Sequence, residues 1–204
     1  VIADPVSDTT PGSIEIGFNR AACGNCSSIL WNNLQRNPDK IAVTGTSGTL
    51  TYRQLIAEAA RWGHAFQRSG LKPGDRIPFL LDDTPVFIAA FFGAVRLGFV
   101  PVLLNTQTTT DHLDYFLKDT SAKLALCEAP LLKIFNAEAL KGTDVTNIIV
   151  TNGTATAANQ TEAEQFLTGM PDQLDCADTG PDHMALWMYS SGSTGKPKGV
   201  IHLH

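Results

Sequence analysis

The chain has 204 residues, of which 43% are hydrophobic and 17% charged, and its formal net charge is -5. A chain of this length can bury roughly 70% of the surface that its unfolded form exposes, so a sizeable core is expected and global disorder is excluded. The acidic balance argues against nucleic acid and anionic membranes as partners. The longest apolar run, Val86–Leu104, contains Arg96, Gly98 and Pro101, so no membrane-spanning helix is expected. The first twelve residues do not resemble a signal peptide.

The four cysteines, Cys23, Cys26, Cys127 and Cys176, are too few and too scattered for a disulfide scaffold. They favour a protein of the reducing cytoplasm. The Cys23–Cys26 pair lacks the second ligand pair of a zinc site, and it precedes the first strand, whereas redox pairs usually follow a strand. We interpret the pair as small residues at the entrance of a helix.

Residues 1–40 are expected to form an arm and a short helix over 29–34. Strands over 41–45 and 49–52 then predict a hairpin. Thr51 and Gln54 have the spacing of a capping box, and the apolar residues that follow recur every three or four positions as far as Phe66, which predicts a helix.

Residues 41–151 then alternate strand and helix. The predicted strands are 76–81, 100–105, 124–127 and 147–150, and the predicted helices are 85–97, 111–118 and 131–140. This order builds right-handed crossovers onto a parallel sheet. The expected fold class is therefore α/β, with a largely parallel sheet and helices on both faces. The helix over 85–97 is apolar on nearly every side, so it is expected to be buried.

Residues 152–183 contain no lysine or arginine and are expected to form an irregular acidic connection with one short helix over 163–167. The final segment, 184–204, begins with six consecutive apolar residues, which predict a strand over 184–189 that is buried on both faces. A further strand is expected from Val200. Because no turn closes that strand, the sequence suggests a fragment of a longer protein.

A glycine-rich loop lies between these two strands. Its sequence, from Tyr189 to Val200, contains three glycines, four serine or threonine residues and two lysines. Glycines let backbone N–H groups converge on an anion, hydroxyls add donors, and ammonium groups offset negative charge. The loop is therefore predicted to bind an oligophosphate. It does not match the P-loop of ATPases, because Ser190 and Pro197 stand where that motif requires a glycine and a hydroxyl residue, and no G-x-G-x-x-G is present.

The segment from Ser190 to Val200 resembles the signature phosphate loop of the adenylate-forming superfamily, [ST]-[ST]-G-[ST]-T-G-x-P-K-G-V, and matches it at every defined position. The superfamily comprises acyl-CoA synthetases, luciferases and peptide-synthetase adenylation domains. Leu50-Thr-Tyr-Arg-Gln-Leu and the segment 93–105 are similar to the N-terminal subdomain of that family. The segment 186–195, followed by His202 and His204, looks most like the benzoate and other aryl-CoA ligases.

The resemblance implies that an acid attacks the α-phosphate of ATP, as its Mg²⁺ complex, to give an acyl adenylate and pyrophosphate, and that coenzyme A then displaces AMP. It implies that the third substrate is a small-molecule carboxylic acid, with aromatic acids as the first candidates. The ATP phosphates would be held by Ser190, Ser191, Gly192, Ser193, Thr194, Gly195, Lys196 and Lys198. The remaining family motifs lie beyond residue 204, so this chain alone is expected to be inactive, and no catalytic residue is assigned within it.

His202 and His204 alternate along the last predicted strand and would share one face, where they could line the acyl pocket. Two histidines alone are a weak metal signal, and no metal site is predicted. Two other functions stay open at this point. One is a peptide-synthetase adenylation domain, and the other is a truncated, non-catalytic module that binds phosphate or a partner.

Overall fold

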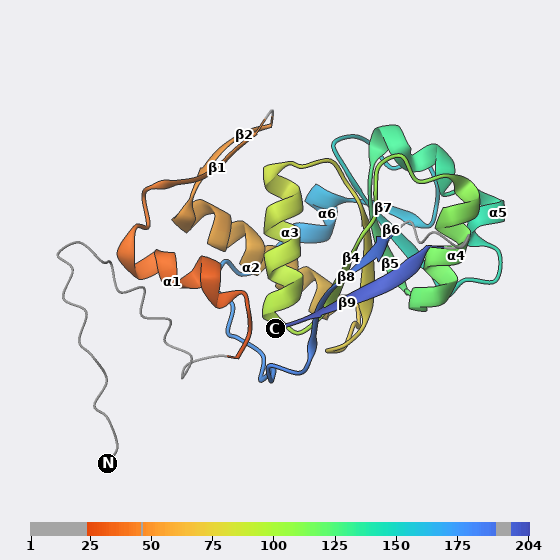
Figure 1. The fold of residues 1–204 in the computed structure, drawn as a ribbon. Coiled ribbons are helices and arrows are strands. Elements are labelled where there is room, and N and C mark those ends of the chain that lie inside the picture. The colour runs from red at the N-terminus through yellow and green to blue at the C-terminus, as the bar shows by residue number, and fades with distance from the viewer. Residues whose placement is uncertain (1–23, 46, 191–196) are drawn as a thin grey trace, which may run out of the picture.

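The computed structural model describes residues 24–45, 47–190 and 197–204, and its centre is a seven-stranded sheet with helices on both faces (Figure 1). The strand order is β7-β6-β5-β3-β4-β8-β9. The strands are β3 (Arg76–Leu80), β4 (Val100–Leu103), β5 (Leu124–Glu128), β6 (Asn147–Thr151), β7 (Gln160–Glu162), β8 (Met184–Ser190) and β9 (Lys198–Leu203). All neighbouring pairs are parallel except β8 and β9. The predicted α/β class with a largely parallel sheet is confirmed.

The N-terminal part of the described chain lies beside this sheet rather than in it. It contains α1 (Ser28–Arg36), the hairpin of β1 (Ile41–Gly45) and β2 (Gly48–Thr51), and α2 (Tyr52–Arg68). The hydroxyl of Thr51 accepts from the backbone N–H of Gln54, and the Gln54 side chain accepts from the N–H of Thr51. The predicted capping box is therefore present, and it fixes where the hairpin ends and the helix begins.

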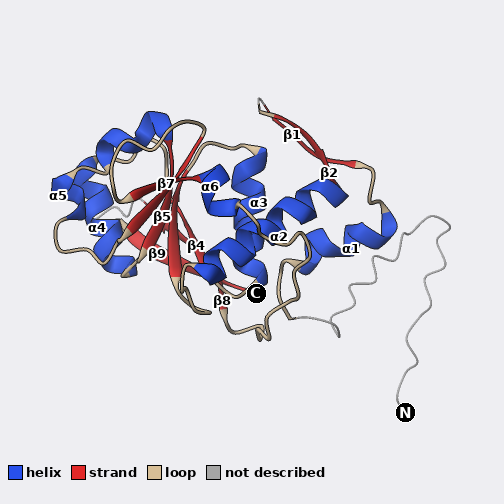
Figure 2. Ribbon diagram, turned by 180° about the vertical axis from the view of Figure 1, so that it is seen from behind, coloured by secondary structure: helices blue, strands red, loops and turns tan. Residues whose placement is uncertain are grey.

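One face of the sheet is covered by α2, α3 (Pro85–Arg96) and α6 (Ala163–Leu167), as Figure 2 shows from behind. The Thr84 side chain caps α3 and Pro85 occupies its first turn, as predicted. The expectation that α3 is buried holds in full for six of its twelve residues, and the other six, including Phe91 and Phe92, are partly buried. The helix buries its small residues against α2 and leaves its phenylalanines at the margin of the core.

The other face carries α4 (Thr110–Thr120), a 3₁₀ helix over Ala129–Ile134 and α5 (Ala137–Leu140). The sequence predicts one continuous helix over 131–140, and this is wrong. Asn136 has an extended backbone (φ -84°, ψ 177°), and its side chain accepts from the N–H groups of Glu138 and Ala139. An asparagine that caps a new helix in this way ends the previous one.

The connection over 152–183 contains one strand that the sequence does not predict. Residues Gln160–Glu162 pair with β6 as β7, and the predicted helix follows directly as α6. The strand has three residues, Gln, Thr and Glu, which lack the apolar alternation by which strands are recognised. Backbone pairing with β6, rather than side-chain burial, therefore defines it.

The strand β8 lies beside β4, so the segments 41–151 and 184–204 share one sheet. The prediction that β8 is buried on both faces is wrong, since Ala185 is its only fully buried residue and Met188 is 44% exposed. Its neighbour β9 forms the edge of the sheet and is exposed along its whole length. The helices cover the middle strands and leave this end of the sheet less protected.

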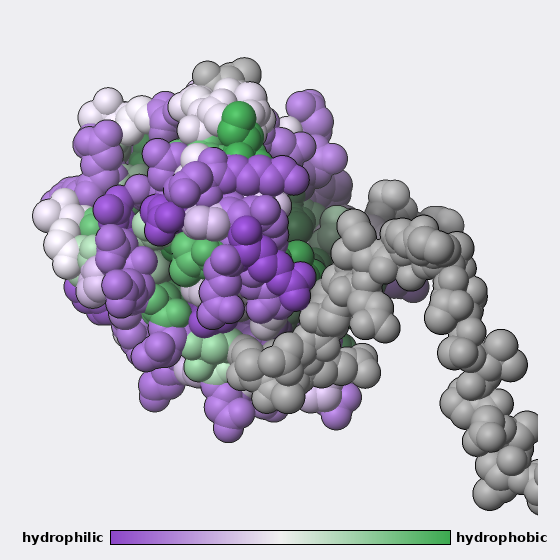
Figure 3. Space-filling view, turned by 90° about the vertical axis from the view of Figure 1, so that its left-hand side faces the viewer, coloured by the Kyte–Doolittle hydropathy of each residue, from purple (hydrophilic) through white to green (hydrophobic). Residues whose placement is uncertain are grey.

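None of the helices over the described residues is long and apolar enough to cross a membrane. The side of the molecule that carries α1 and the hairpin is mainly hydrophilic, with small hydrophobic areas between polar side chains (Figure 3). Cys176 is disulfide-bonded, a bond that the sequence analysis does not predict. Cys26 and Cys127 are free thiols, and Cys23 lies outside the described residues.

The helices α2 and α3 approach closely at Gly63 and Gly93. A Cβ atom placed on Gly93 would lie 2.3 Å from the carbonyl oxygen of Ala59 and 2.8 Å from the nitrogen of Gly63. Both are backbone atoms of α2, so neither can move aside by changing rotamer. The two glycines therefore set the distance between the helices.

We expect Gly93→Ala to lower the free energy of unfolding by about 1–3 kcal/mol, the usual cost of overpacking a well-filled core. Thermal unfolding measures this change. Gly180→Ala is the matched control, because a Cβ atom at Gly180 would contact nothing within 4 Å. Equal melting temperatures for the two variants would contradict the close helix contact.

Candidate functional site

The predicted phosphate-binding residues fall partly outside the described chain. Residues 191–196 are among those not described, so the structure locates only Ser190 and Lys198 of the predicted set. These two residues are partners in the antiparallel pairing of β8 with β9, and both are exposed. The residues at the two ends of the loop are therefore neighbours on the paired strands β8 and β9.

The last glycine of the loop motif lies against a tryptophan of β8. A Cβ atom placed on Gly199 would lie 1.9 Å from Nε1 of Trp187 and 2.4 Å from Cε2 of the same ring. The indole ring thus occupies the space that a side chain at position 199 would need. Only glycine lets β9 approach β8 closely here, which gives a packing reason for Gly199 beside any phosphate contact.

Tyr189, directly before the loop, is bound to helix α4. Its hydroxyl donates to Oδ2 of Asp119 over 2.7 Å, and its ring centroid lies 4.1 Å from that of Phe116. Burial, followed by the hydrogen bond to Asp119, raises the pKa of Tyr189 above its ordinary value, so the phenol stays protonated. Asp119 is 70 positions away in sequence, and no local pattern could have linked the two residues.

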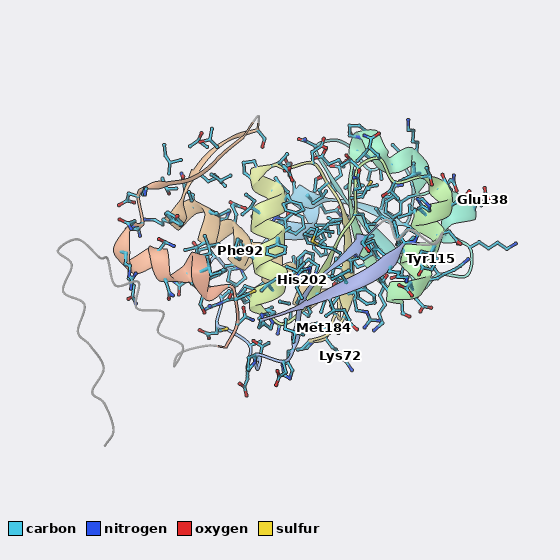
Figure 4. All side chains as sticks on the ribbon, in the orientation of Figure 1. Lys72, Phe92, Tyr115, Glu138, Met184 and His202 are labelled. Carbon is cyan, nitrogen blue, oxygen red and sulfur yellow. The ribbon has the colours of Figure 1, made fainter. Side chains whose placement is uncertain are left out.

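The two C-terminal histidines differ in their surroundings. His202 is exposed on β9, and Figure 4 shows it near one end of that strand, with Tyr115 on α4 toward the other end. His204 follows the end of β9 and is half-buried; its Nδ1 accepts from the backbone N–H of Cys26 over 3.2 Å. Burial, and then the nearby His183, lower the pKa of His204, so its ring is neutral near pH 7. The ring of His204 is thus already bound to the N-terminal segment.

A buried carboxyl group at the end of β5 was not singled out from the sequence. Glu128 is 4% exposed, and burial, followed by the negative charge of Asp82, raises its pKa. Asn152, just after β6, is also in hydrogen-bond contact with it. Its position in the sequence could have indicated this, since a glutamate that directly follows the predicted buried strand 124–127 lies at the end of that strand.

A cavity of about 660 Å³ lies between the β1–β2 turn, α2, the start of α3 and α6. Among the described residues, its wall contains the carboxylates Glu58, Glu162 and Glu164 and no lysine or arginine, and Glu58 is paired with Arg61 behind the wall; neither Ser190 nor Lys198 lines the cavity. Such a wall repels polyphosphate, because like charges across a cavity of low polarity are unfavourable. The loop and its two strands, rather than this cavity, are therefore the candidate phosphate site.

Over the residues that the structure describes, no three histidine, cysteine, aspartate or glutamate side chains come together as a metal site. Magnesium ions in nucleotide sites are commonly held by one or two carboxylates together with substrate phosphates, and they keep several waters. The described side chains thus supply no magnesium cage of their own.

We expect Gly199→Ala to destabilise the β8–β9 pair, because the new methyl group would meet the Trp187 indole. A loss of about 1–3 kcal/mol is typical of such overpacking. In a Trp187→Leu background, where the indole is absent, Gly199→Ala should cost less stability than it does in the wild type. Thermal unfolding of the two single variants and the double variant measures both costs. Additive losses in the double variant would show that the indole is not the obstacle.

We expect the stability gained by Glu128→Gln to depend on pH. The folded protein keeps a proton on Glu128 above the ordinary glutamate pKa of about 4.3, so wild-type stability falls as the pH rises from that value toward the raised pKa. Glutamine removes this loss. The melting temperature of the variant, relative to wild type, should therefore rise from pH 4 to pH 7. Glu138→Gln on exposed α5 is the control, and a difference independent of pH would contradict the raised pKa.

Comparison with known proteins places this loop and sheet in a family. The model of the AMP-binding enzyme family matches residues 30–204. A 3-hydroxybenzoate–CoA/4-hydroxybenzoate–CoA ligase of Thauera aromatica is 33% identical over 166 residues, which cover 81% of this chain and 32% of that enzyme. Phosphinothricin tripeptide synthetase PhsC of Streptomyces viridochromogenes is 31% identical over 176 residues, covering 86% of this chain and 15% of that protein.

A solved structure shows the same fold. The anthranilate CoA ligase AuaEII, in complex with anthranoyl-AMP, superposes with a TM-score of 0.81 at 27% identity, covering 88% of this chain and 35% of that one. The chain thus spans about a third of the length of the ligases that it matches. Since the family model covers most of the chain, including the β8–β9 pair and the loop between them, the chain belongs to the AMP-binding enzyme family.

Proposed function

We propose that this chain is the N-terminal part of an ATP-dependent carboxylic acid–CoA ligase. The observation that carries the proposal is the loop from Ser190 to Val200, whose sequence matches the family signature at every defined position and whose ends are paired strands. The mouth of the loop presents the Ser190 hydroxyl and the Lys198 ammonium group to solvent. Both groups favour an anionic ligand at this place.

The proposed reaction has two steps. A carboxylate oxygen of the acid attacks the α-phosphorus of ATP, and the bond to the bridging oxygen breaks to release pyrophosphate. The thiolate of coenzyme A then attacks the acyl carbon, and AMP leaves. Nucleotidyl transfer of this kind depends mainly on positioning and on charge stabilisation.

The loop residues would act on the leaving group. Lys198 would offset the charge that develops on pyrophosphate, and Ser190 would donate to a phosphate oxygen, together with Ser191, Gly192, Ser193, Thr194, Gly195 and Lys196. Magnesium ion, when bound with ATP, would supply further positive charge at the phosphates. The described residues contribute binding and orientation, and no proton transfer is assigned to them.

We infer an aromatic acid as the substrate. The relatives named above include a ligase of hydroxybenzoates and a ligase whose structure contains anthranoyl-AMP. Both act on, or hold, a benzoic acid that carries a polar ring substituent. His202 and His204 remain candidates for the acyl side, with His202 the more accessible of the two. Because ATP and coenzyme A are the proposed co-substrates, we place the reaction in the cytoplasm.

Two other functions make different predictions. A peptide-synthetase adenylation domain, favoured by the likeness to phosphinothricin tripeptide synthetase, would pass its acyl group to a carrier-protein thiol rather than to coenzyme A. A non-catalytic phosphate-binding module would bind ATP without forming an adenylate. Release of pyrophosphate and the identity of the acyl acceptor therefore separate the three functions.

We expect the full-length protein to catalyse acid-dependent exchange of labelled pyrophosphate into ATP, with benzoate or a substituted benzoate as the acid. Coenzyme A should then yield an aryl-CoA. Lys198→Ala should raise the KM for ATP about tenfold, because a charge-assisted hydrogen bond contributes about 1.4 kcal/mol or more.

Lys72→Ala is the matched control, since Lys72 is equally exposed but precedes β3, far along the chain from the loop. No exchange with any acid would overturn the ligase proposal. Exchange without aryl-CoA formation would favour the peptide-synthetase function.

A further inference from the structure

We propose that Asp119, at the last turn of α4 and outside the loop motif, is a positioning residue for the phosphate loop and acts through Tyr189. The inference rests on the proposed function, because it assigns to Asp119 an effect on ATP binding. Asp119 would not contact ATP itself. It would hold the strand from which the loop departs.

The loop-bearing hairpin has little backbone support. The strand β8 pairs with β4 only at Trp187 and Met188, opposite Val102 and Leu103. Beyond Met188, its remaining strand partner is β9, which is the edge of the sheet and is exposed throughout. Tyr189 and Ser190 therefore extend past the last backbone pair that joins them to the body of the sheet.

Side-chain contacts supply the missing support at this point. The Tyr189 ring packs on Phe116 at 4.1 Å between centroids and lies 6.2 Å from the Tyr115 ring, and both partners belong to α4. The hydroxyl donates to Asp119 on the same helix over 2.7 Å. Aromatic packing limits the distance between strand and helix, whereas the hydrogen bond also fixes where along α4 the ring sits.

Tyr189 transmits its position to both ends of the loop. It is covalently joined to Ser190, at the start, and it is the pairing partner of Gly199, next to Lys198, at the end. A shift of Tyr189 along α4 would displace the Ser190 hydroxyl and the Lys198 ammonium group together. The spacing between these two groups and the bound phosphates therefore depends on the contact with α4.

The chemistry of the pair favours a persistent contact. A carboxylate acceptor makes a stronger hydrogen bond than a neutral one, and the phenol donates while it is protonated. A carboxylate in the last turn of a helix is unfavourable for the helix itself, because the helix dipole places partial negative charge there. Helix stability thus gives no reason for an aspartate at position 119, and the bond to Tyr189 does.

The test uses the full-length protein and four variants: Tyr189→Phe, Asp119→Ala, the double variant of these two, and Asp119→Asn. Tyr189→Phe keeps the ring and loses the hydroxyl, while Asp119→Asn keeps an oxygen acceptor. The KM for ATP and kcat are measured by pyrophosphate exchange, and ATP binding is measured directly by calorimetry. Tyr52→Phe on α2 and Asp111→Ala at the start of α4 are the matched controls.

We expect Tyr189→Phe and Asp119→Ala each to raise the KM and the dissociation constant for ATP about threefold to tenfold, with kcat changed less than twofold. The double variant should be no worse than either single variant, and Asp119→Asn should restore most of the ATP affinity. The controls should match wild type. Unchanged ATP affinity, or additive losses in the double variant, would overturn the positioning role.

Failure of the proposed function is a separate outcome. If wild-type protein shows no exchange with any acid, the ligase proposal fails, and the positioning role is judged by amide hydrogen exchange over Ser190 and 198–200. Faster exchange there in Tyr189→Phe and Asp119→Ala, but not in the controls, supports the contact as an anchor of the loop stem. Exchange rates equal to wild type would overturn it.

Discussion

Two backbone pairs, Val102 with Trp187 and Leu103 with Met188, join the segment that carries the phosphate loop to the rest of the sheet. Parallel pairing over so short a length leaves the end of β8 free to move unless side chains hold it. Trp187 and Tyr189 point to the same side of the strand, because alternate residues share a face. That side is packed against α4. The position of the strand from which the loop departs therefore depends on α4, the amphipathic helix that connects β4 to β5.

The close approach of β9 depends on the same aromatic residues. The Trp187 indole occupies the space next to Gly199, so at this position β9 can pair with β8 only because residue 199 has no side chain. The physical reason for a glycine at position 199 is thus the indole beside it, since its backbone does not lie in the left-handed region that glycine favours. A glycine of a phosphate-binding motif can therefore be required by the packing of the strands beside it, as Gly199 is by Trp187.

Electrostatics distinguishes the large cavity from the phosphate loop. Among the described residues that line the large cavity beside α2 and α3, the charged ones are all glutamates, of which Glu58 is paired with Arg61, whereas the loop carries lysines and hydroxyls. A polyanion such as ATP is favoured at the second and disfavoured at the first. The buried Glu128 is a second acidic feature, at the end of β5, and its raised pKa reflects burial first and the neighbouring Asp82 second.

The sequence by itself determined the alternation of strands and helices, the caps at Thr51 and Thr84, and the chemistry of the loop, because periodicity, capping and motif composition are local properties. Local patterns failed where another signal decided the outcome: Asn136 ended one helix, and β7 formed by backbone pairing without an apolar pattern. Only the tertiary structure decided that β8 inserts beside β4 and that Tyr189 meets Asp119, 70 positions earlier. The physical reason is that strand order and side-chain contacts between distant segments follow from how whole faces pack together, which no short stretch of sequence contains.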